Sequence, residues 1–444
     1  IKEETMKRYE TNINNTIHMK ISKVTLVDKP SNLEWNIINI YPTMEKQQWL
    51  GLGGSLTEST ACNLLQLSPI KRNQVIKMYF HKNGLNYNFL RLPIGSNDFC
   101  LNHYENLETN DFSKINFTRE EKYLLPILTQ IFKINIPQII ASPWSPPEIY
   151  KENKYCFNGD KLLNDYYRDY AKYLVHTINY YKHKKIKINY LTIQNEPFAK
   201  QRWESCYFTL DEQKEFIYNY LIPELKSSDC QILLWDHNKD NLIKVFKKLY
   251  EDNPLIGGVA YHWYTGTHEK NLSTVRKLMP NKLLINTEAC CGYSSYSIKE
   301  YLSKAEYYLM NILSDIECGS NAFVDWNMIL DFNGGPTHAN NPCAAPIILD
   351  EKGKNYIITP IYQYLKQFSS TIENNSFIIE TDVYRKDLFC VSCKNNSKIN
   401  IIILNIMDYD MEFNLVIENK YFSDKICAHS FLSYTISQSE FDFN

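Results

Sequence analysis

Two glutamates stand at the ends of apolar runs, where packing alone does not explain a carboxylate. Residues 190–197 include Glu196, and residues 282–290 include Glu288. A carboxylate beside a buried strand needs a partner or a chemical role, because burial without either is costly. Two acids that face each other are suited to cleavage of a glycosidic bond. One protonates the departing oxygen, and the other attacks the anomeric carbon or activates water, depending on their separation.

Two nearby side chains fit the same chemistry. Asn195 directly precedes Glu196 and can hydrogen-bond the 2-hydroxyl of a sugar, a contact that strengthens in the transition state. Tyr264 follows another apolar run and can donate to Glu288, which would hold that carboxyl ionised. These residue types therefore favour a sugar-cleaving site built around the two acids.

Other polar and aromatic side chains follow apolar runs, and each has a structural explanation as well. They are Arg91, Asp98, Trp144, Asp236, His237, His262 and Trp326. The aspartates can cap helices, the tryptophans can pack at a rim, the arginine can serve an ion pair and the histidines can be satisfied inside a core. From the residues alone these alternatives stay open.

Eight short apolar runs alternate with longer amphipathic segments. The runs are residues 49–57, 87–95, 138–144, 190–197, 231–238, 258–264, 282–290 and 322–328. Helices are predicted over 68–80, 164–181 and 209–217, the first from Ser68 before Pro69 and the last from Thr209 with Glu212 at capping-box spacing. Eight strand–helix repeats predict an α/β fold, a (β/α)8 TIM barrel, with its working face at the carboxyl ends of the strands.

The two chain ends have a different pattern. Residues 21–27 and 35–40 resemble strands, and after about residue 367 short strands replace helices, at 377–380, 388–392, 399–404, 413–417 and 428–436. A closed barrel has no edge to accept additional strands. We therefore expect an appended antiparallel β-sandwich domain built from both ends: residues 1–47 and 367–444 around a catalytic barrel of residues 48–366.

Composition excludes several classes of protein. The net charge is −2 with scattered Lys and Arg, which argues against nucleic acid as a partner. No apolar run approaches the roughly 20 residues of a membrane span, so no transmembrane segment is expected. The chain opens at Ile1 without an apolar signal segment, and we expect a mature or trimmed form. Five Asn-x-Ser/Thr motifs permit a secretory route.

Motifs for metals and cofactors are weak. The 12 cysteines permit disulfides without requiring them. Cys390 and Cys393 form a lone C-x-x-C motif without a second pair at zinc-site spacing, and residues three apart in a strand face opposite ways. No H-x-x-x-H spacing occurs, and the glycines at 51–54 do not complete G-x-G-x-x-G. We expect no metal and no cofactor.

An ordered series of motifs runs through most of the chain. It comprises G-L-G-G-S-L-T-E at 51–58, R-L-P-I-G-S-N-D-F at 91–99, S-P-W-S-P-P at 142–147, Q-N-E-P at 194–197, W-E-S-C at 203–206, H-W-Y at 262–264, T-E-A-C-C-G at 287–292, D-W-N at 325–327, G-G-P at 334–336 and A-P-I-I-L-D at 345–350. The series resembles glycoside hydrolase family 30, and within it the glucosylceramidase (β-glucocerebrosidase) group. The family fold is a (β/α)8 barrel fused to a β domain from both chain ends.

The resemblance implies a retaining mechanism, with Glu196 as acid/base and Glu288 as nucleophile. It implies that the glucosyl unit is held by Asp98, Trp144, Asn195, Trp326 and Asn341. It also implies that Arg91, Tyr264 and His262 surround the nucleophile. The loop at 198–203 departs from the mammalian lysosomal enzyme: it is shorter and contains Trp203, which we expect to shape the leaving-group side of the substrate site.

Three functions remain open at this level. The resemblance implies hydrolysis of glucosylceramide to glucose and ceramide by double displacement, but some family members cut β-1,6-glucan with similar sugar-binding residues. A non-catalytic glycan-binding protein is the alternative of a different class. A glucosylceramidase would work in the secretory pathway, lysosomal or secreted, with room for an activator protein that presents the lipid and for peripheral contact with a membrane.

Overall fold

The structure is a computed structural model that describes residues 5–12, 17–27, 34, 36–226, 228–395 and 398–437. Trp35, the first residue of one strand expected from the sequence, lies outside these residues. The chain separates into two compact units. One comprises residues 52–296 and 322–357, and the other comprises residues 1–51, 297–321 and 358–444.

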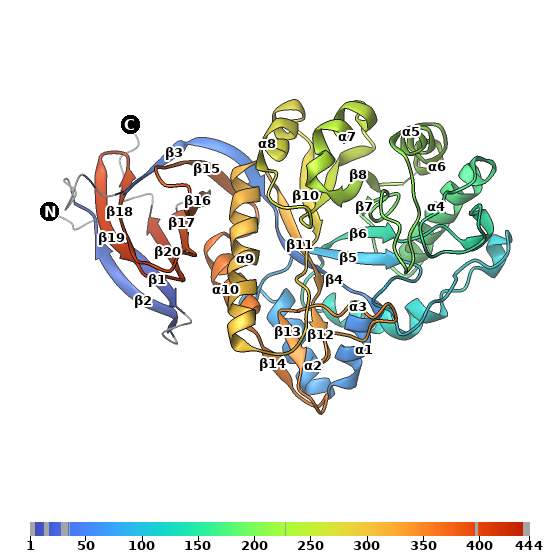
Figure 1. Ribbon diagram of the computed structural model, residues 1–444, viewed down its shortest axis with the longest axis horizontal. Coiled ribbons are helices and arrows are strands. Elements are labelled where there is room, and N and C mark those ends of the chain that lie inside the picture. Colours follow the sequence, from blue (N-terminus) through green and yellow to red (C-terminus); the bar gives the residue numbers. More distant parts are fainter. Residues whose placement is uncertain are drawn as a thin grey trace. The chain divides into compact units, whose positions relative to one another are not determined.

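Eight parallel strands of the first unit close into a barrel, as the sequence predicted (Figure 1). Around the barrel the order is β10-β11-β4-β5-β6-β7-β8-β9. The strands are β4 (Gly51–Ser55), β5 (Phe89–Ile94), β6 (Gln138–Pro143), β7 (Tyr190–Leu191), β8 (Gln231–Asn238), β9 (Ile256–His262), β10 (Leu283–Glu288) and β11 (Ala322–Asn327). Where β4 meets β11, Thr57 Oγ1 donates to Asn327 Oδ1 at 2.6 Å.

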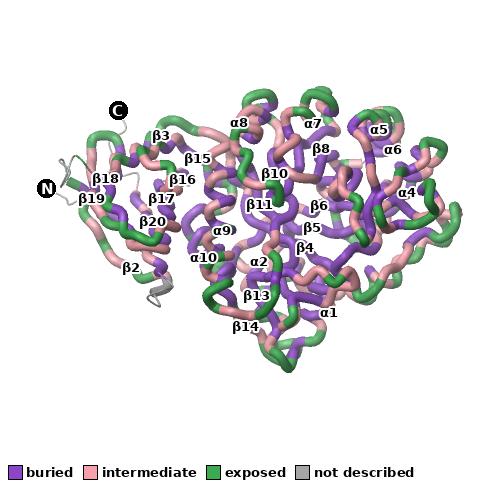
Figure 2. The backbone as a smooth tube through the Cα atoms, viewed as in Figure 1, coloured by how far each residue is buried: buried purple, intermediate pink, exposed green. Residues whose placement is uncertain are grey.

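The barrel strands are buried on both faces, which explains their continuous apolar sequences. Every residue of β5 and of β9 is buried (Figure 2). Parallel strands that are covered on both sides have no solvent-facing positions, so the alternation of apolar and polar residues disappears. The polar residues that do occur, such as Arg91 on β5, are therefore exceptions that need partners inside the barrel.

Helices connect the barrel strands and lie outside them (Figure 1). They are α1 (Glu58–Gln66), α2 (Pro69–Phe80), α3 (Leu125–Ile131), α4 (Tyr167–His183), α5 (Leu210–Glu215), α6 (Ile222–Leu225), α7 (Leu242–Leu249) and α8 (Glu269–Leu278). Both predicted start signals are confirmed. The Ser68 side chain accepts from the Lys71 N–H ahead of Pro69, and Thr209 and Glu212 form a reciprocal capping box.

Several shorter elements complete this unit. They are the single turns η2 (Phe112–Lys114), η3 (Glu120–Leu124), η4 (Glu148–Tyr150), η5 (Asn164–Tyr166), η6 (Phe216–Leu221) and η7 (Lys239–Asn241), and the strands β12 (Ile329–Leu330), β13 (Ile347–Leu349) and β14 (Tyr356–Ile358). The last three strands form a small sheet of their own.

The second unit contains a nine-stranded sheet built from both chain ends, as expected. Its order is β19-β18-β3-β15-β16-β17-β20-β1-β2. The strands are β1 (Thr5–Asn12), β2 (Ile17–Thr25), β3 (Asn36–Trp49), β15 (Ser376–Val383), β16 (Leu388–Asn395), β17 (Lys398–Asn405), β18 (Met411–Ile417), β19 (Lys420–Ile426) and β20 (Ser430–Ser437). The β3–β18 pair is parallel, and the other described pairs are antiparallel. The unit also includes α9 (Ile298–Glu317) and α10 (Pro360–Thr371).

One apolar core joins distant parts of this sheet. Ile38 of β3, Ile379 of β15, Ile401 of β17 and Leu415 of β18 belong to the same buried cluster. The N-terminal strands therefore contribute to the core of the C-terminal ones, which explains why both ends are needed for one sheet.

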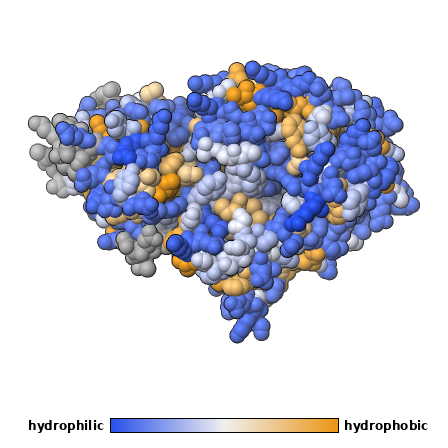
Figure 3. Space-filling view, in the orientation of Figure 1, coloured by the Kyte–Doolittle hydropathy of each residue, from blue (hydrophilic) through white to orange (hydrophobic). Residues whose placement is uncertain are grey.

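Among the residues that the structure describes, none of the helices is long and apolar enough to cross a membrane. The face of the molecule in Figure 3 is mostly hydrophilic, with small, separate hydrophobic areas.

Candidate active site

Glu196 and Glu288 both lie at the carboxyl ends of barrel strands. Glu288 is the last residue of β10, and Glu196 follows β7, where its N–H donates to the backbone oxygen of Asp236 at 2.9 Å. Glu196 has a φ of 48° and Asp236 has a φ of 63°, both in the left-handed region. Such backbone conformations cost energy outside glycine and concentrate where a side chain must be aimed.

Arg91 joins the surroundings of the two glutamates. From β5, its Nη1 donates to Glu288 Oε2 at 2.6 Å, and its Nη2 donates to Asn195 Oδ1 at 2.9 Å. The same Nη2 donates to Asp236 Oδ2 at 2.8 Å. The guanidinium is fully buried, so these ionic hydrogen bonds form at low dielectric and hold their partners in fixed positions.

Asp236 accepts hydrogen bonds from four side chains. Thr192 and Thr287 each donate through Oγ1 at 2.6 Å, in addition to Arg91, and His262 Nε2 lies 3.1 Å from Oδ1. Burial opposes ionisation, but Arg91 and His262 hold the pKa of Asp236 well below its usual value. Asp236 is therefore a buried anion that fixes Arg91 and His262, and the helix-cap alternative for this residue is wrong.

His262 lies between the two acidic neighbours Asp236 and Glu196. Its Nδ1 is 3.2 Å from Glu196 Oε1, and its Nε2 contacts Asp236. Burial lowers the pKa of His262, but Glu288, Asp236 and Glu196 together raise it to about 9. At neutral pH the ring is an imidazolium that donates from both nitrogens.

The surroundings of the two glutamates shift their pKa values differently. Burial works to raise the pKa of Glu196, but the hydrogen bond and charge of His262 outweigh it and hold that pKa below its ordinary value. Burial raises the pKa of Glu288, and the charge of Glu196 adds to the rise while His262 and Arg91 limit it. The surroundings in the free enzyme therefore shift the two pKa values in opposite directions.

Tyr264 completes the contacts of Glu288, as the sequence predicted. Its hydroxyl donates to Glu288 Oε1 at 2.9 Å, so the two carboxylate oxygens have different donors, Tyr264 and Arg91. The same hydroxyl lies 3.5 Å from Cys290 Sγ. These contacts fix the orientation of the Glu288 carboxylate.

The aromatic residues expected from the sequence lie together beside this network. The rings of Trp144 and Trp326 stack at 5.0 Å, and the guanidinium of Arg91 lies 4.7 Å from the centre of the Trp144 ring. Trp203 packs against the same cluster, which also contains Phe99. Stacked aromatic walls beside polar groups are typical of a small-molecule site.

Asp98 and Asn341 form a pair at the same site. Asn341 Nδ2 donates to Asp98 Oδ2 at 2.8 Å, whereas Asp98 Oδ1 is buried without a partner among the described residues. Burial and the charge of Glu288 raise the pKa of Asp98 to about 8. Asp98 caps no helix, and its second oxygen is available to a hydroxyl group of a ligand.

Hydrogen bonds and ring contacts connect Glu196, Glu288, Asn195, Arg91, Tyr264, His262, Trp144 and Trp326, Trp203 packs against the two tryptophans, and Asp98 and Asn341 bind each other. Asp236 is the main residue whose part the sequence left undecided. The sequence shows Asp236 at the end of an apolar run, and a residue that caps the following helix occurs at the same kind of position. Thr192 and Thr287, which donate to Asp236, and Ser142, which accepts from Arg91 Nε, had no signal because small hydroxyl residues are common in strands.

A family model described as the glycosyl hydrolase family 30 TIM-barrel domain matches residues 49–372. The chain belongs to glycosyl hydrolase family 30. It is a glycoside hydrolase of the glucosylceramidase-like kind, in a family that typically retains anomeric configuration.

Relatives of this family 30 enzyme include glucosylceramidases. The putative glucosylceramidase 3 of Caenorhabditis elegans is 30% identical over 76% of this chain and 69% of its own length. The lysosomal acid glucosylceramidase of Mus musculus is 29% identical over 77% of this chain and 71% of its own.

Two solved structures resemble the enzyme closely. SrfJ from Salmonella typhimurium has a TM-score of 0.93 at 25% identity, covering 98% of this chain and 100% of that one. An endo-β1,6-glucanase has a TM-score of 0.84 at 25% identity, covering 98% and 99%.

Proposed function

We propose that this family 30 enzyme is a retaining β-glucosidase that hydrolyses glucosylceramide to glucose and ceramide. The observation that supports it most is the fixed Glu288 carboxylate, with Arg91 on one oxygen and Tyr264 on the other. The glucosylceramidases among its relatives support the choice of substrate.

In the proposed mechanism Glu288 is the nucleophile and Glu196 is the acid/base. The Glu288 carboxylate attacks the anomeric carbon while Glu196 gives its proton to the glycosidic oxygen, so the ceramide leaves as an alcohol. Ionised Glu196 then takes a proton from water, which attacks the same carbon and displaces Glu288. Two inversions retain the configuration.

The contacts of the free enzyme assign one further task to His262. Glu196 must hold a proton when the glycosidic bond breaks, whereas in the free enzyme the charge of His262 favours its ionised form. A proton must therefore pass to Glu196 as substrate binds. His262, 3.2 Å away, opposes this protonation through its positive charge, and it therefore sets the pH below which Glu196 can act as the acid.

The sugar side of the site is proposed to consist of Asp98, Asn341, Asn195 and the two stacked tryptophans. Asp98 Oδ1, which is buried and has no partner among the described residues, would accept from a glucose hydroxyl. Trp144 and Trp326 would exclude water beside the ring, and Trp203 would line the leaving-group side.

The test of the proposed roles is a pair of variants assayed on an aryl β-glucoside. Glu288→Gln should abolish turnover, because the amide cannot form the glycosyl ester. Glu196→Ala should also lose activity, and azide should restore part of it, because azide can attack the intermediate without a general base. Wild-type rates in both variants would end the assignment.

A β-1,6-glucanase is the second candidate, favoured by the likeness to the solved endo-β1,6-glucanase. Rates on glucosylceramide in detergent micelles and on soluble β-1,6-glucan separate the two. A higher kcat/KM on the lipid supports the first proposal, and a higher value on the glucan replaces it. A non-catalytic glycan-binding protein is disfavoured because binding alone does not require the two carboxyls.

The proposed substrate also bears on location and partners. The lysosomal relative supports a place in the secretory pathway, lysosomal or secreted. A substrate whose ceramide is embedded in a membrane would call for an activator protein that presents the lipid, or for direct contact with the membrane surface.

A further inference from the structure

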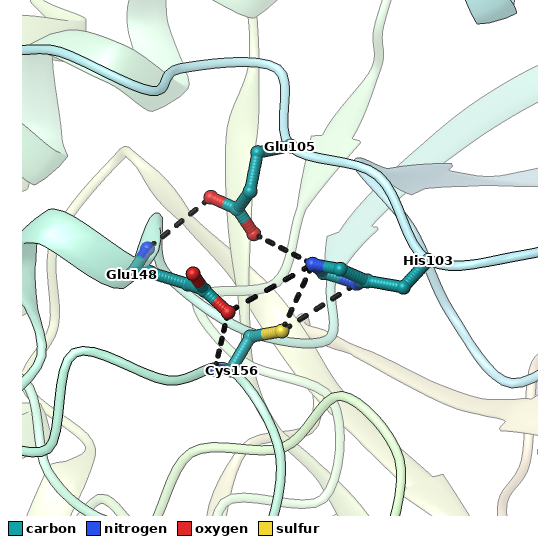
Figure 4. A group of neighbouring side chains, drawn as sticks. All are labelled: His103, Glu105, Glu148 and Cys156. Atoms are coloured by element: carbon teal, nitrogen blue, oxygen red, sulfur yellow. Dashed lines mark hydrogen bonds and ion pairs between the residues drawn. The ribbon is translucent and has the colours of Figure 1, made fainter.

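Four potential metal ligands gather outside the catalytic network. His103 and Glu105 lie in the segment after β5, Glu148 begins η4 after β6, and Cys156 follows in the next loop. Figure 4 shows the four side chains pointing toward one another. One ligand atom from each lies within 4.8 Å of all the others.

The spacing of these atoms suits tetrahedral coordination. His103 Nε2 is 3.3 Å from Cys156 Sγ, 3.5 Å from Glu105 Oε1 and 3.9 Å from Glu148 Oε1. Zinc binds nitrogen, oxygen and sulfur at about 2.0–2.3 Å, and a tetrahedron with those radii has edges of about 3.3–3.8 Å. The distances from the histidine nitrogen to Cys156 and Glu105 fall in this range, and the distance to Glu148 is slightly longer.

Hydrogen bonds around the cluster orient the ligands. His103 Nδ1 lies 2.8 Å from Glu204 Oε1, which fixes the tautomer that leaves Nε2 free to bind a metal. The Glu148 N–H donates to Glu105 Oε2 at 3.2 Å, and the Cys156 N–H donates to Glu148 Oε1 at 3.1 Å. A carboxylate behind a ligating histidine and hydrogen-bonded ligating carboxylates are the usual surroundings of bound zinc.

The cluster also lacks compensating positive charge from longer side chains. Within the described part of the chain, no Lys or Arg forms an ion pair with Glu105, Glu148 or Glu204. Their ion-pair partners are His103 and His338. A divalent cation would balance the carboxylates at low energetic cost.

We propose that His103, Glu105, Glu148 and Cys156 bind one zinc-class divalent cation. The mixture of imidazole, thiolate and carboxylates disfavours calcium and magnesium, which prefer oxygen ligands alone. Four protein ligands make a closed, structural site. Cys156 is buried, while the side chains of His103 and Glu148 are 26% and 31% exposed and give the ion a path in.

The ion would connect loops that shape the substrate site. It would join the loops after β5 and β6, and through Glu204 it would steady the loop after β7 that contains Trp203. The proposal replaces our expectation from the sequence that no metal is bound. The ligands come from separate loops, so no motif spacing could predict the site.

The test is cobalt(II) titration of the purified chain, read by absorption and by metal content after dialysis. We expect one cobalt per chain, a near-ultraviolet thiolate-to-cobalt band and visible bands of tetrahedral cobalt. Cys156→Ser should lose the thiolate band. Glu204→Gln should weaken binding by about 10- to 100-fold, because it removes the support behind His103. Glu148→Gln changes a partly exposed position and should also weaken cobalt binding. It is the test variant to use if Cys156→Ser fails to fold.

Two control variants make the outcome specific. Cys206→Ser removes another buried thiol outside the cluster and should keep every band. Glu196→Gln tests the alternative group of Glu196, His237 and His262 and should leave cobalt binding unchanged. The proposal is overturned if the wild type binds no cobalt, if the thiolate band survives in Cys156→Ser, or if Glu196→Gln abolishes binding.

Discussion

The imidazole of His262 lies 3.2 Å from the carboxylate of Glu196 and carries a positive charge at neutral pH. This contact lowers the pKa of the residue that we propose as the acid. Activity requires protonated Glu196, so activity is lost as the pH rises through that pKa.

Replacing His262 with glutamine should therefore move the basic limb of the pH profile upward. Loss of the positive charge raises the pKa of Glu196, and we expect a shift of about one pH unit or more in kcat/KM. His237→Gln is a matched control, because His237 Nδ1 lies farther from the same oxygen, at 3.7 Å, and should give a smaller shift. A basic limb that stays in place in His262→Gln would contradict the account.

We expect replacement of Asp98 by asparagine to increase stability and to reduce activity. Burial raises its pKa to about 8 from the ordinary value of 3.8, so the protonated carboxyl favours the folded state. That contribution is complete below 3.8 and lost as the pH rises to about 8. Asp98→Asn, which cannot ionise, should be more stable than the wild type near pH 8, by about 1–3 kcal/mol in urea unfolding.

The gain from Asp98→Asn should vanish near pH 4, where the wild-type carboxyl is protonated as well. If Asp98 binds a glucose hydroxyl, kcat/KM should fall by about 100-fold or more. Equal stability gains at both pH values would show that the pKa is not the cause.

Arg91 should be among the most sensitive positions in the barrel. Arg91→Met leaves Asp236 and Glu288 buried without their cation, and we expect a loss of about 3–5 kcal/mol in the free energy of unfolding. Arg119→Met is the control: its partner Glu58 is also buried, but the Arg119 side chain is 23% exposed, so its loss should cost less. Equal losses in the two variants would contradict the proposed importance of the buried network.

Tyr264→Phe tests whether Tyr264 orients the Glu288 carboxylate for catalysis or only stabilises the fold. The variant removes the hydroxyl that donates to Glu288 Oε1 and keeps the ring. We expect kcat to fall by about 10- to 100-fold, with less than about 1 kcal/mol lost in stability, because one donor to a reacting carboxylate is removed. A large drop in Tm with kcat unchanged would instead assign Tyr264 a purely structural part.

The sequence predicted most of the barrel because both-face burial leaves a plain signal. Runs such as residues 89–94 are apolar apart from Arg91, and the polar residues at the ends of such runs pointed to the site. The strands β1 and β19 were missed because their sequences, TMKRYETN and KYFSDKI, contain several charged residues. Only pairing with neighbours in three dimensions selects a strand there.

The sequence predicted the site residues whose chemistry allows few residue types. It predicted less well those residues whose role depends on their contacts in the folded structure. Glu196 and Glu288 stood out as acids after buried runs. Asp236 had the same position but also the pattern of a helix cap, and only its four donors distinguish the two. His103 and Cys156 are 53 residues apart, so no spacing rule brings them together.

The most direct test of the central claim is covalent trapping with a 2-deoxy-2-fluoro-β-glucosyl fluoride. The fluorine slows breakdown of the glycosyl ester, so intact mass and peptide mapping can identify the nucleophile. We predict a single glucosyl adduct on Glu288, absent from Glu288→Gln. An adduct on another residue, or turnover of an aryl β-glucoside without any adduct, would contradict the account.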